Sequence, residues 1–191
     1  MKDLLMHIHP LRAHIEEVLP LTDQEFDFIL SHFTPVSKRK HQYLVQEGEL
    51  VNKEHWVIKG CLKAYFFDQN GKEYIVQFAM ENWWITDYEA FNNQIRASFS
   101  VDCIEDCELL AIDYASREKL SSEMHKMERF WAKKTKLAFI ASQKRILSLC
   151  RNTAKERYEM LLNQYPQLVQ RVPKKMLASY LGVSRETLSR L

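Results

Sequence analysis

The chain has only four glycines among its 191 residues, and their positions separate regions that can fold in different ways. Gly48, Gly60 and Gly71 interrupt short runs of β-branched, aromatic and alternating residues between positions 34 and 112. Asn70 precedes Gly71, and an Asn-Gly pair is the strongest short hairpin signal because both residues tolerate a positive φ. Many short strands with regular turns predict an antiparallel sandwich or roll. The predicted strands are Tyr43–Val45, His55–Ile58, Leu62–Phe67, Tyr74–Phe78, Phe99–Cys103 and Leu109–Ile112.

Helical patterns precede this β region. Leu11 and Ile15 recur at helical spacing until Pro20 interrupts the run. Thr22, with Glu25 three positions later, has the pattern of a capping box at the start of a second helix. We therefore expect two helices within residues 1–33.

Residues 116–150 contain neither glycine nor proline and consist mainly of good helix formers. They predict one helix of roughly 50 Å, which is longer than a domain of this size. Its apolar residues form several neighbouring stripes, wider than packing on one surface requires. We infer that one stripe packs on the β region and another on a second copy of the chain. The alternative is that all the stripes form a single wide face that packs on the core of the same chain. The residues assigned to this dimer helix are Phe130, Trp131, Leu137, Ala138 and Ala141.

The net charge of +2 conceals a basic C-terminal end. Residues 144–191 contain ten Lys or Arg against three acidic residues, whereas residues 1–143 contain seventeen against twenty-two. A basic end on an acidic body indicates contact with a polyanion, although a solvated basic face would give the same composition. Within this end, Ala154–Gln164 has a helical pattern that stops before Pro166.

Residues 174–191 have the pattern of two short helices that cross at a tight turn. Ala178 is small where the helices approach each other, and Gly182, four positions later, suits a turn that needs a positive φ. Ser184 is a good cap for the second helix. The alternative is an ordinary helical hairpin without DNA-binding function. The apolar contacts between the two helices are expected from Leu177, Val183 and Leu188.

The expected exposed face of this motif holds side chains suited to DNA. Arg185 and Arg190 can each donate two hydrogen bonds to guanine O6 and N7, and Glu186 can accept one from cytosine N4. Other polar residues are better placed for the phosphate backbone, where they would fix the register of binding. The pattern therefore predicts a DNA-binding helix-turn-helix. The residues assigned to phosphate are Lys174, Lys175, Ser179, Ser184 and Thr187.

With these features, the chain resembles the Crp/Fnr family of bacterial transcription regulators over nearly its whole length. The three glycines of the β region fall where the family's cyclic-nucleotide-binding-type roll keeps its turn glycines, and Ser184–Thr187 with Arg190 is similar to the recognition helix of the cyclic-AMP-responsive branch. The resemblance implies an α+β fold: an N-terminal antiparallel β-roll with flanking helices over 1–115, a long dimerisation helix over 116–150, and a C-terminal winged helix-turn-helix over 151–191.

The resemblance also implies how such a protein works. We expect a cytoplasmic homodimer that binds a two-fold DNA operator containing GTGA-like half-sites about 34 Å apart. Further partners would be RNA polymerase and a small-molecule effector of unknown identity. A dimeric scaffold whose last helices bind protein is an alternative, and only a DNA-binding protein would lose affinity steeply with salt.

The effector site departs from the family pattern. The family's phosphate-binding segment needs a glycine and a glutamate, where this chain has Thr86 and Asp87, and Arg96 is displaced by about one position from the arginine that pairs with the cyclic phosphate. We therefore expect that the chain does not bind cyclic AMP. The alternative is a genuine nucleotide sensor in which Arg96 contacts the phosphate. Aromatic residues of this segment could line a pocket for another effector, but such residues more often belong to the core. The candidate effector residues are Trp84, Thr86, Asp87, Tyr88, Arg96 and Ser98.

Other functional classes find little support. The four cysteines lack the neighbouring ligands of a metal site, and Cys103 and Cys107 are better explained as buried thiols. No nucleophile motif or P-loop accompanies the scattered histidines, so we expect neither a catalytic residue nor a metal ligand. No stretch of 18 apolar residues predicts a membrane span.

Overall fold

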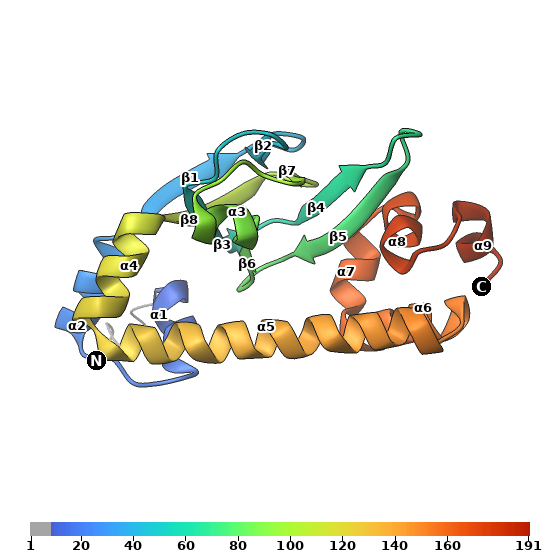
Figure 1. Cartoon of the computed structure of the whole chain (residues 1–191). Coiled ribbons are helices and arrows are strands. Elements are labelled where there is room, and N and C mark those ends of the chain that lie inside the picture. Colours follow the sequence, from blue (N-terminus) through green and yellow to red (C-terminus); the bar gives the residue numbers. More distant parts are fainter. Residues whose placement is uncertain (1–8) are drawn as a thin grey trace.

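The computed structural model describes residues 9–191, in which a β-roll lies above one long helix, α5 (His125–Arg151). Figure 1 shows α5 running the length of the molecule, from the N-terminal helices at one end to the C-terminal helices at the other. The N-terminal helices are α1 (Pro10–Glu16) and α2 (Asp23–Leu30). Thr22 and Glu25 form the predicted capping box in front of α2.

The roll consists of two four-stranded antiparallel sheets, ordered β1-β8-β3-β6 and β2-β7-β4-β5. The predicted strands all coincide with observed ones except for residue Phe99, and the Asn70-Gly71 turn joins β4 to β5 with Gly71 at φ 75°. Two strands were not predicted: β1 contains Pro35, which an edge strand tolerates, and β6 has two residues. The strands are β1 (Thr34–Lys38), β2 (Tyr43–Val45), β3 (Lys53–Lys59), β4 (Leu62–Phe67), β5 (Glu73–Ala79), β6 (Trp84–Ile85), β7 (Ser100–Cys103) and β8 (Cys107–Asp113).

Side chains alternate between the two faces of each strand, and this divides the hydrophobic core into one cluster inside the roll and one between the roll and the helices. Val57 of β3 and Leu109 of β8 point into the roll, where α3 (Tyr88–Asn93) contributes Phe91. Trp56 and Leu110, their neighbours along the strands, point out of the roll toward the helices. The roll is therefore packed inside and also carries a second apolar surface that the helices cover.

The helix predicted over 116–150 is divided at Met124, which has extended backbone angles of φ −134° and ψ 96°. The result is α4 (Tyr114–Glu123) followed by α5. Leu120 of α4 and Met127 and Phe130 of α5 are all 0% exposed and belong to the same apolar cluster. The break therefore lets two helix segments cover one surface of the roll, which a straight helix of this length would not do.

The C-terminal helices follow at the far end of α5. They include α6 (Ala154–Gln164) over the predicted range, while Pro166 starts α7 rather than only ending α6. No strand follows β8 in residues 114–191, so the described chain contains the helix-turn-helix without the wing of the predicted winged helix. The remaining helices are α7 (Pro166–Arg171), α8 (Lys174–Leu181) and α9 (Arg185–Ser189).

Candidate nucleic-acid interface and effector site

Helices α8 and α9 form a helix-turn-helix. Gly182 ends α8 in the left-handed conformation, at φ 69° and ψ 33°, as the sequence predicts. Val183 N–H donates to the Ala178 carbonyl at 3.0 Å, which closes the turn. Ser184 caps α9, because its hydroxyl accepts a hydrogen bond from Thr187 N–H at 3.1 Å. The local geometry of the predicted motif is therefore confirmed.

One face of this motif is buried. Leu177, Ala178 and Leu188 are between 1% and 5% exposed, and they pack with Leu161 of α6 and Leu168 of α7. Val183 is half-buried against the same cluster. The buried face fixes the orientation of α9, so the opposite face is the one available to a partner.

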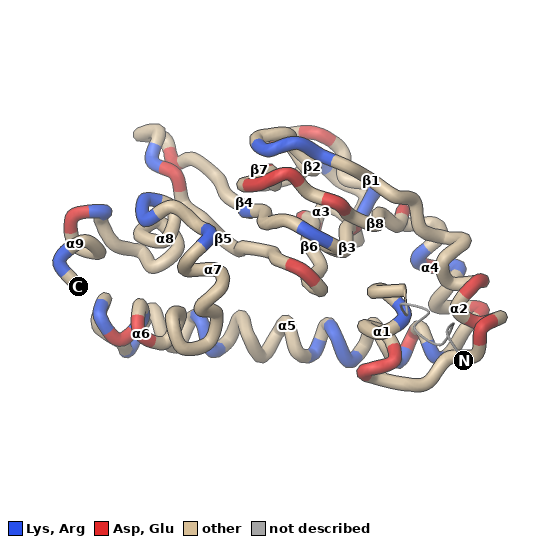
Figure 2. The backbone as a smooth tube through the Cα atoms, turned by 180° about the vertical axis from the view of Figure 1, so that it is seen from behind, with Lys and Arg blue, Asp and Glu red and all other residues tan. Residues whose placement is uncertain are grey.

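The predicted base-reading residues lie outside the buried face. Arg185, Glu186 and Arg190 are all exposed. A backbone N–H at the start of α9, and then the Ser184 hydroxyl, lower the pKa of the Glu186 carboxyl, which keeps it ionised as a hydrogen-bond acceptor. Lys174 and Lys175 are exposed at the start of α8, and Figure 2 shows basic positions at α8 and α9. Both helices therefore present basic side chains, and the acidic Glu186 lies between Arg185 at the start of α9 and Arg190 just after its end.

Ser179 does not have the environment predicted for a phosphate contact. Its hydroxyl donates to the Glu73 carbonyl at 2.7 Å and accepts from Ile75 N–H at 3.1 Å, both on β5. Strand β5 is the edge of its sheet, and this hydroxyl satisfies backbone groups that no neighbouring strand pairs. Ser179 therefore joins α8 to the roll, and the phosphate role predicted for it is not supported in this arrangement. Thr187 is exposed, as a phosphate contact requires.

Two arginines that the sequence analysis did not select also join the C-terminal helices to the roll. Arg145 of α5 donates to the carbonyls of Val76, of Ile75 at 3.0 Å and of Tyr180 at 3.2 Å, and its guanidinium lies 4.1 Å from the centre of the Tyr180 ring. Arg171 of α7 contacts the carboxylates of Glu81 and Glu105, each at 2.7 Å. Their partners lie 35 to 90 residues away in sequence, so no local pattern signals them.

The candidate effector segment is occupied by internal hydrogen bonds. The Asp87 carboxylate accepts from Ala90 N–H at 3.1 Å and, through its other oxygen, from the N–H and hydroxyl of Ser98 at 2.8 and 2.9 Å. The Thr86 hydroxyl donates to the Lys53 carbonyl at 2.9 Å. A bound phosphate would need N–H and O–H donors of this kind. The two donors of Ser98 are instead taken up by the Asp87 carboxylate.

The other candidate effector residues do not converge on a phosphate. The Arg96 guanidinium donates to the Gly48 carbonyl at 2.7 Å and is exposed. Trp84 packs in an edge-to-face contact 4.7 Å from Trp131, so it belongs to the aromatic core beneath the roll. The Tyr88 ring is 39% exposed. These residues do not fit a cyclic nucleotide in the arrangement observed.

The residues assigned to the dimer helix divide into two groups. Phe130 and Trp131 are 0% and 6% exposed in the core of their own chain, so they belong to the stripe of α5 that packs on the roll. Leu137 is 51% exposed, and Ala138 and Ala141 are exposed as well. The most exposed apolar side chains of α5 were not selected, although they continue the helical stripes: Phe139 at 62% and Ile146 at 60%.

Other predicted features concern cysteines and membrane spans. Cys103 and Cys107 are buried free thiols, and Cys150 is exposed. Among residues 9–191, no cluster of three or more potential metal ligands occurs. In the same part of the chain, no helix has the length and hydropathy needed to cross a bilayer.

Comparison with known proteins agrees with this architecture. The family model of the cyclic nucleotide-binding domain matches residues 35–123, which contain the roll and α4. The chain is 25% identical to the cAMP-activated global transcriptional regulator CRP of Salmonella typhimurium over 184 residues, covering 90% of this chain and 87% of that protein.

Solved structures show the same fold. FixK2 from Bradyrhizobium japonicum has a TM-score of 0.72 at 22% identity, covering 83% of this chain and 81% of its own. The c-di-GMP-responsive global regulator CLP of Xanthomonas campestris also has a TM-score of 0.72, at 15% identity, covering 88% and 89%. With its roll, its long helix and its glycine-turn helix pair, the chain is similar to the transcription regulators of the Crp/Fnr family, and residues 35–123 match the cyclic nucleotide-binding domain.

Proposed function

We propose that this chain is a sequence-specific DNA-binding regulator that works as a homodimer, with α9 in the major groove. One observation carries the proposal: Arg185, Glu186 and Arg190 project from a helix whose opposite face is buried and whose start is capped. A rigid helix end with two forked donors and one acceptor matches the base edges of the major groove.

Charge supports the same partner. The region from residue 144 onward carries ten basic and three acidic residues. Lys174 and Lys175 at the start of α8, with Ser184 and Thr187 at the start of α9, are the side chains we assign to phosphates. Contacts of this kind release counterions, so affinity should fall steeply with salt.

Dimerisation follows from the exposed side of α5. Phe139, Ile140, Ile146 and Leu147 are 62%, 37%, 60% and 47% exposed, and a groove along this helix is lined by Ile140, Ile146 and Leu147. A monomer rarely exposes such a run of large apolar side chains along one helix. A second copy of α5 would cover them and would place two α9 helices on successive turns of DNA, roughly 34 Å apart.

The control signal is proposed to differ from cyclic AMP. Asp87 holds the donors of Ser98, and Arg96 is engaged by Gly48, so a cyclic phosphate would have to break several internal bonds. Calorimetry with cyclic AMP and cyclic GMP tests this: we expect no binding tighter than about 100 μM, near −5.5 kcal/mol. Tighter binding would favour the nucleotide sensor with Arg96 on the phosphate.

The proposed function is tested by selecting bound sites from random double-stranded DNA, with and without cyclic nucleotides. A two-fold motif, with half-sites separated by one helical turn, is the expected result. Recovery of unselected sequence, or binding insensitive to salt, would support the alternative of a protein-binding scaffold.

A further inference from the structure

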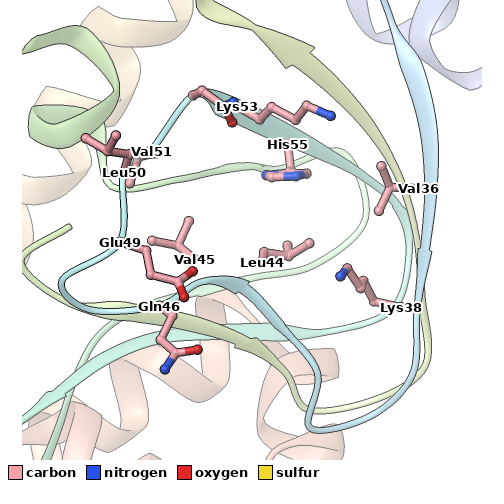
Figure 3. Close-up of a pocket in the computed structure, with 11 residues that line it drawn as sticks. Val36, Lys38, Leu44, Val45, Gln46, Glu49, Leu50, Val51, Lys53 and His55 are labelled. Carbon is pink, nitrogen blue, oxygen red and sulfur yellow. The ribbon is translucent and has the colours of Figure 1, made fainter. Parts of the chain in front are cut away.

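A cavity of about 250 Å³ opens at one end of the roll, between β1, β2, the loop of residues 46–52 and β3 (Figure 3). None of its lining residues belongs to the candidate effector segment around Asp87. Five of its eleven lining residues are apolar, among them Val36, Leu44 and Val51, and the other six are polar or charged. The same cavity is lined by one histidine and two lysines, namely Lys38 of β1 and Lys53 and His55 of β3.

His55 is the most unusual of these side chains. It is 5% exposed, and its enclosed Nδ1 atom has no hydrogen-bond partner among residues 9–191. Burial, and then the charges of Lys53 and Lys38, lower the pKa of His55 to about 4. The ring is therefore neutral at pH 7 and offers both a donor and an acceptor. Buried polar groups in proteins are nearly always hydrogen-bonded, so an unpartnered imidazole on a cavity wall points to a ligand.

The two lysines make this cavity attractive to an anion. None of the ion pairs within 4.0 Å among the described residues includes Lys38 or Lys53, and both lysines are half-buried. Figure 3 shows both amino groups on the same side of the cavity as the imidazole, whereas the Glu49 carboxylate lies on the opposite side near Gln46. Two uncompensated ammonium groups flank a neutral hydrogen-bonding ring.

We propose that this cavity binds a small organic anion, with its carboxylate between Lys38 and Lys53 and a short apolar body against the valines and Leu44. A cavity of this volume is smaller than the sites that hold drug-sized ligands, so the ligand should have on the order of ten non-hydrogen atoms. His55 would hydrogen-bond a polar atom of the ligand and thereby orient it.

The cavity wall is also connected to the candidate effector segment. Two hydrogen bonds join the loop of residues 46–52 to Ala97. Gly48 N–H donates to the Ala97 carbonyl at 2.9 Å, and Ala97 N–H donates to the Glu49 carbonyl at 2.8 Å. A ligand in the cavity would touch this loop directly. The site is therefore placed to influence the segment from Asp87 to Ser98 without entering it.

Titration of the full chain, followed by amide and histidine side-chain NMR, tests the proposal with hexanoate, hexan-1-ol, hexylamine and inorganic phosphate as probes. We expect hexanoate to shift the resonances of His55 and Val51 and to saturate with Kd of about 1 mM, as suits so small a ligand. The alcohol, the amine and phosphate should each bind at least about ten-fold more weakly, because each lacks the charge or the apolar body.

A double variant, Lys38→Met with Lys53→Met, should weaken hexanoate binding about ten-fold, while Lys40→Met, at an exposed position outside the cavity lining, should leave it unchanged. Amide spectra establish that each variant keeps the fold, and His55→Phe, which removes both ring nitrogens, gives an independent variant that should weaken hexanoate binding and reduce the shifts at Val51. Equal binding of hexanoate and hexan-1-ol, equal binding of phosphate, or an unaffected Lys double variant would overturn the proposal.

Discussion

The Ser179→Ala substitution tests how the helix-turn-helix is attached to the roll. The change removes one oxygen and leaves Ile75 N–H and the Glu73 carbonyl on the β5 edge without their partner. An unsatisfied group that is fully buried costs about 1–3 kcal/mol, and Ser179 is half-buried, so we expect a combined loss of about 1–2 kcal/mol. The Arg145 contacts to β5 remain, so the loss should weaken the contact between α8 and β5 without unfolding the chain.

Native-state amide hydrogen exchange measures this effect directly. A loss of about 1–2 kcal/mol corresponds to opening that is roughly 5- to 30-fold more frequent, so the exchange of Ile75 N–H should accelerate by that factor. The exposed Ser189 of α9 provides the matched control, and Ser189→Ala should not change exchange at Ile75. Unchanged exchange of Ile75 in Ser179→Ala would refute the idea that this hydroxyl holds α8 on the roll.

Three further predictions concern the turn, the dimer and pH. Gly182→Ala should destabilise the chain by about 1–2 kcal/mol in urea unfolding, because the added Cβ meets only Leu149 at 3.6 Å and the cost is that of a left-handed alanine; no loss would contradict the turn geometry. Ile146→Glu should convert the proposed dimer to monomer in sedimentation velocity, whereas the exposed Lys133→Glu should not, and a wild-type monomer would argue against the proposed α5 interface. Burial lowers the pKa of both His14 and His55 to about 4, so the unfolded chain binds more protons between pH 6.5 and 4 and stability should fall as pH drops through that window. The free energy of unfolding should fall by about 3 kcal/mol per histidine over this window. In urea unfolding, His55→Phe should reduce the difference in stability between pH 7 and pH 4.5. An unchanged difference would contradict the lowered pKa of His55.

Features set by neighbouring residues were predictable from the sequence. The capping box of Thr22 and Glu25, the Asn70-Gly71 turn and the left-handed Gly182 all depend on residues within four positions of one another. Such features arise from backbone preferences and local hydrogen bonds that act in any fold. The roll and the helix-turn-helix follow from them because short strands and short helices have few ways to bury their apolar faces.

Features set by distant contacts were not predictable in the same way. The stripes of α5 do not show which one meets the chain's own roll, and only the structure places Phe130 in the same core cluster as Trp56. Ser179 matches a phosphate contact by position, yet its partners lie more than 100 residues earlier on β5. Met124 ends α4 without a glycine or proline, because tertiary packing of Leu120 and Met127 favours the break. In each case the deciding interaction joins residues that no sequence window contains.

The most direct test of the proposed function is the affinity of wild-type and Arg185→Ala protein for the selected DNA site and for random DNA at the same salt concentration. If Arg185 reads a base, the variant should lose about 1–3 kcal/mol on the selected site, roughly 5- to 150-fold in Kd, and lose preference at one base pair of each half-site. Its affinity for random DNA should change much less than that. Equal losses on both DNAs would show that Arg185 contributes only charge, and would contradict the assignment of α9 as the recognition helix.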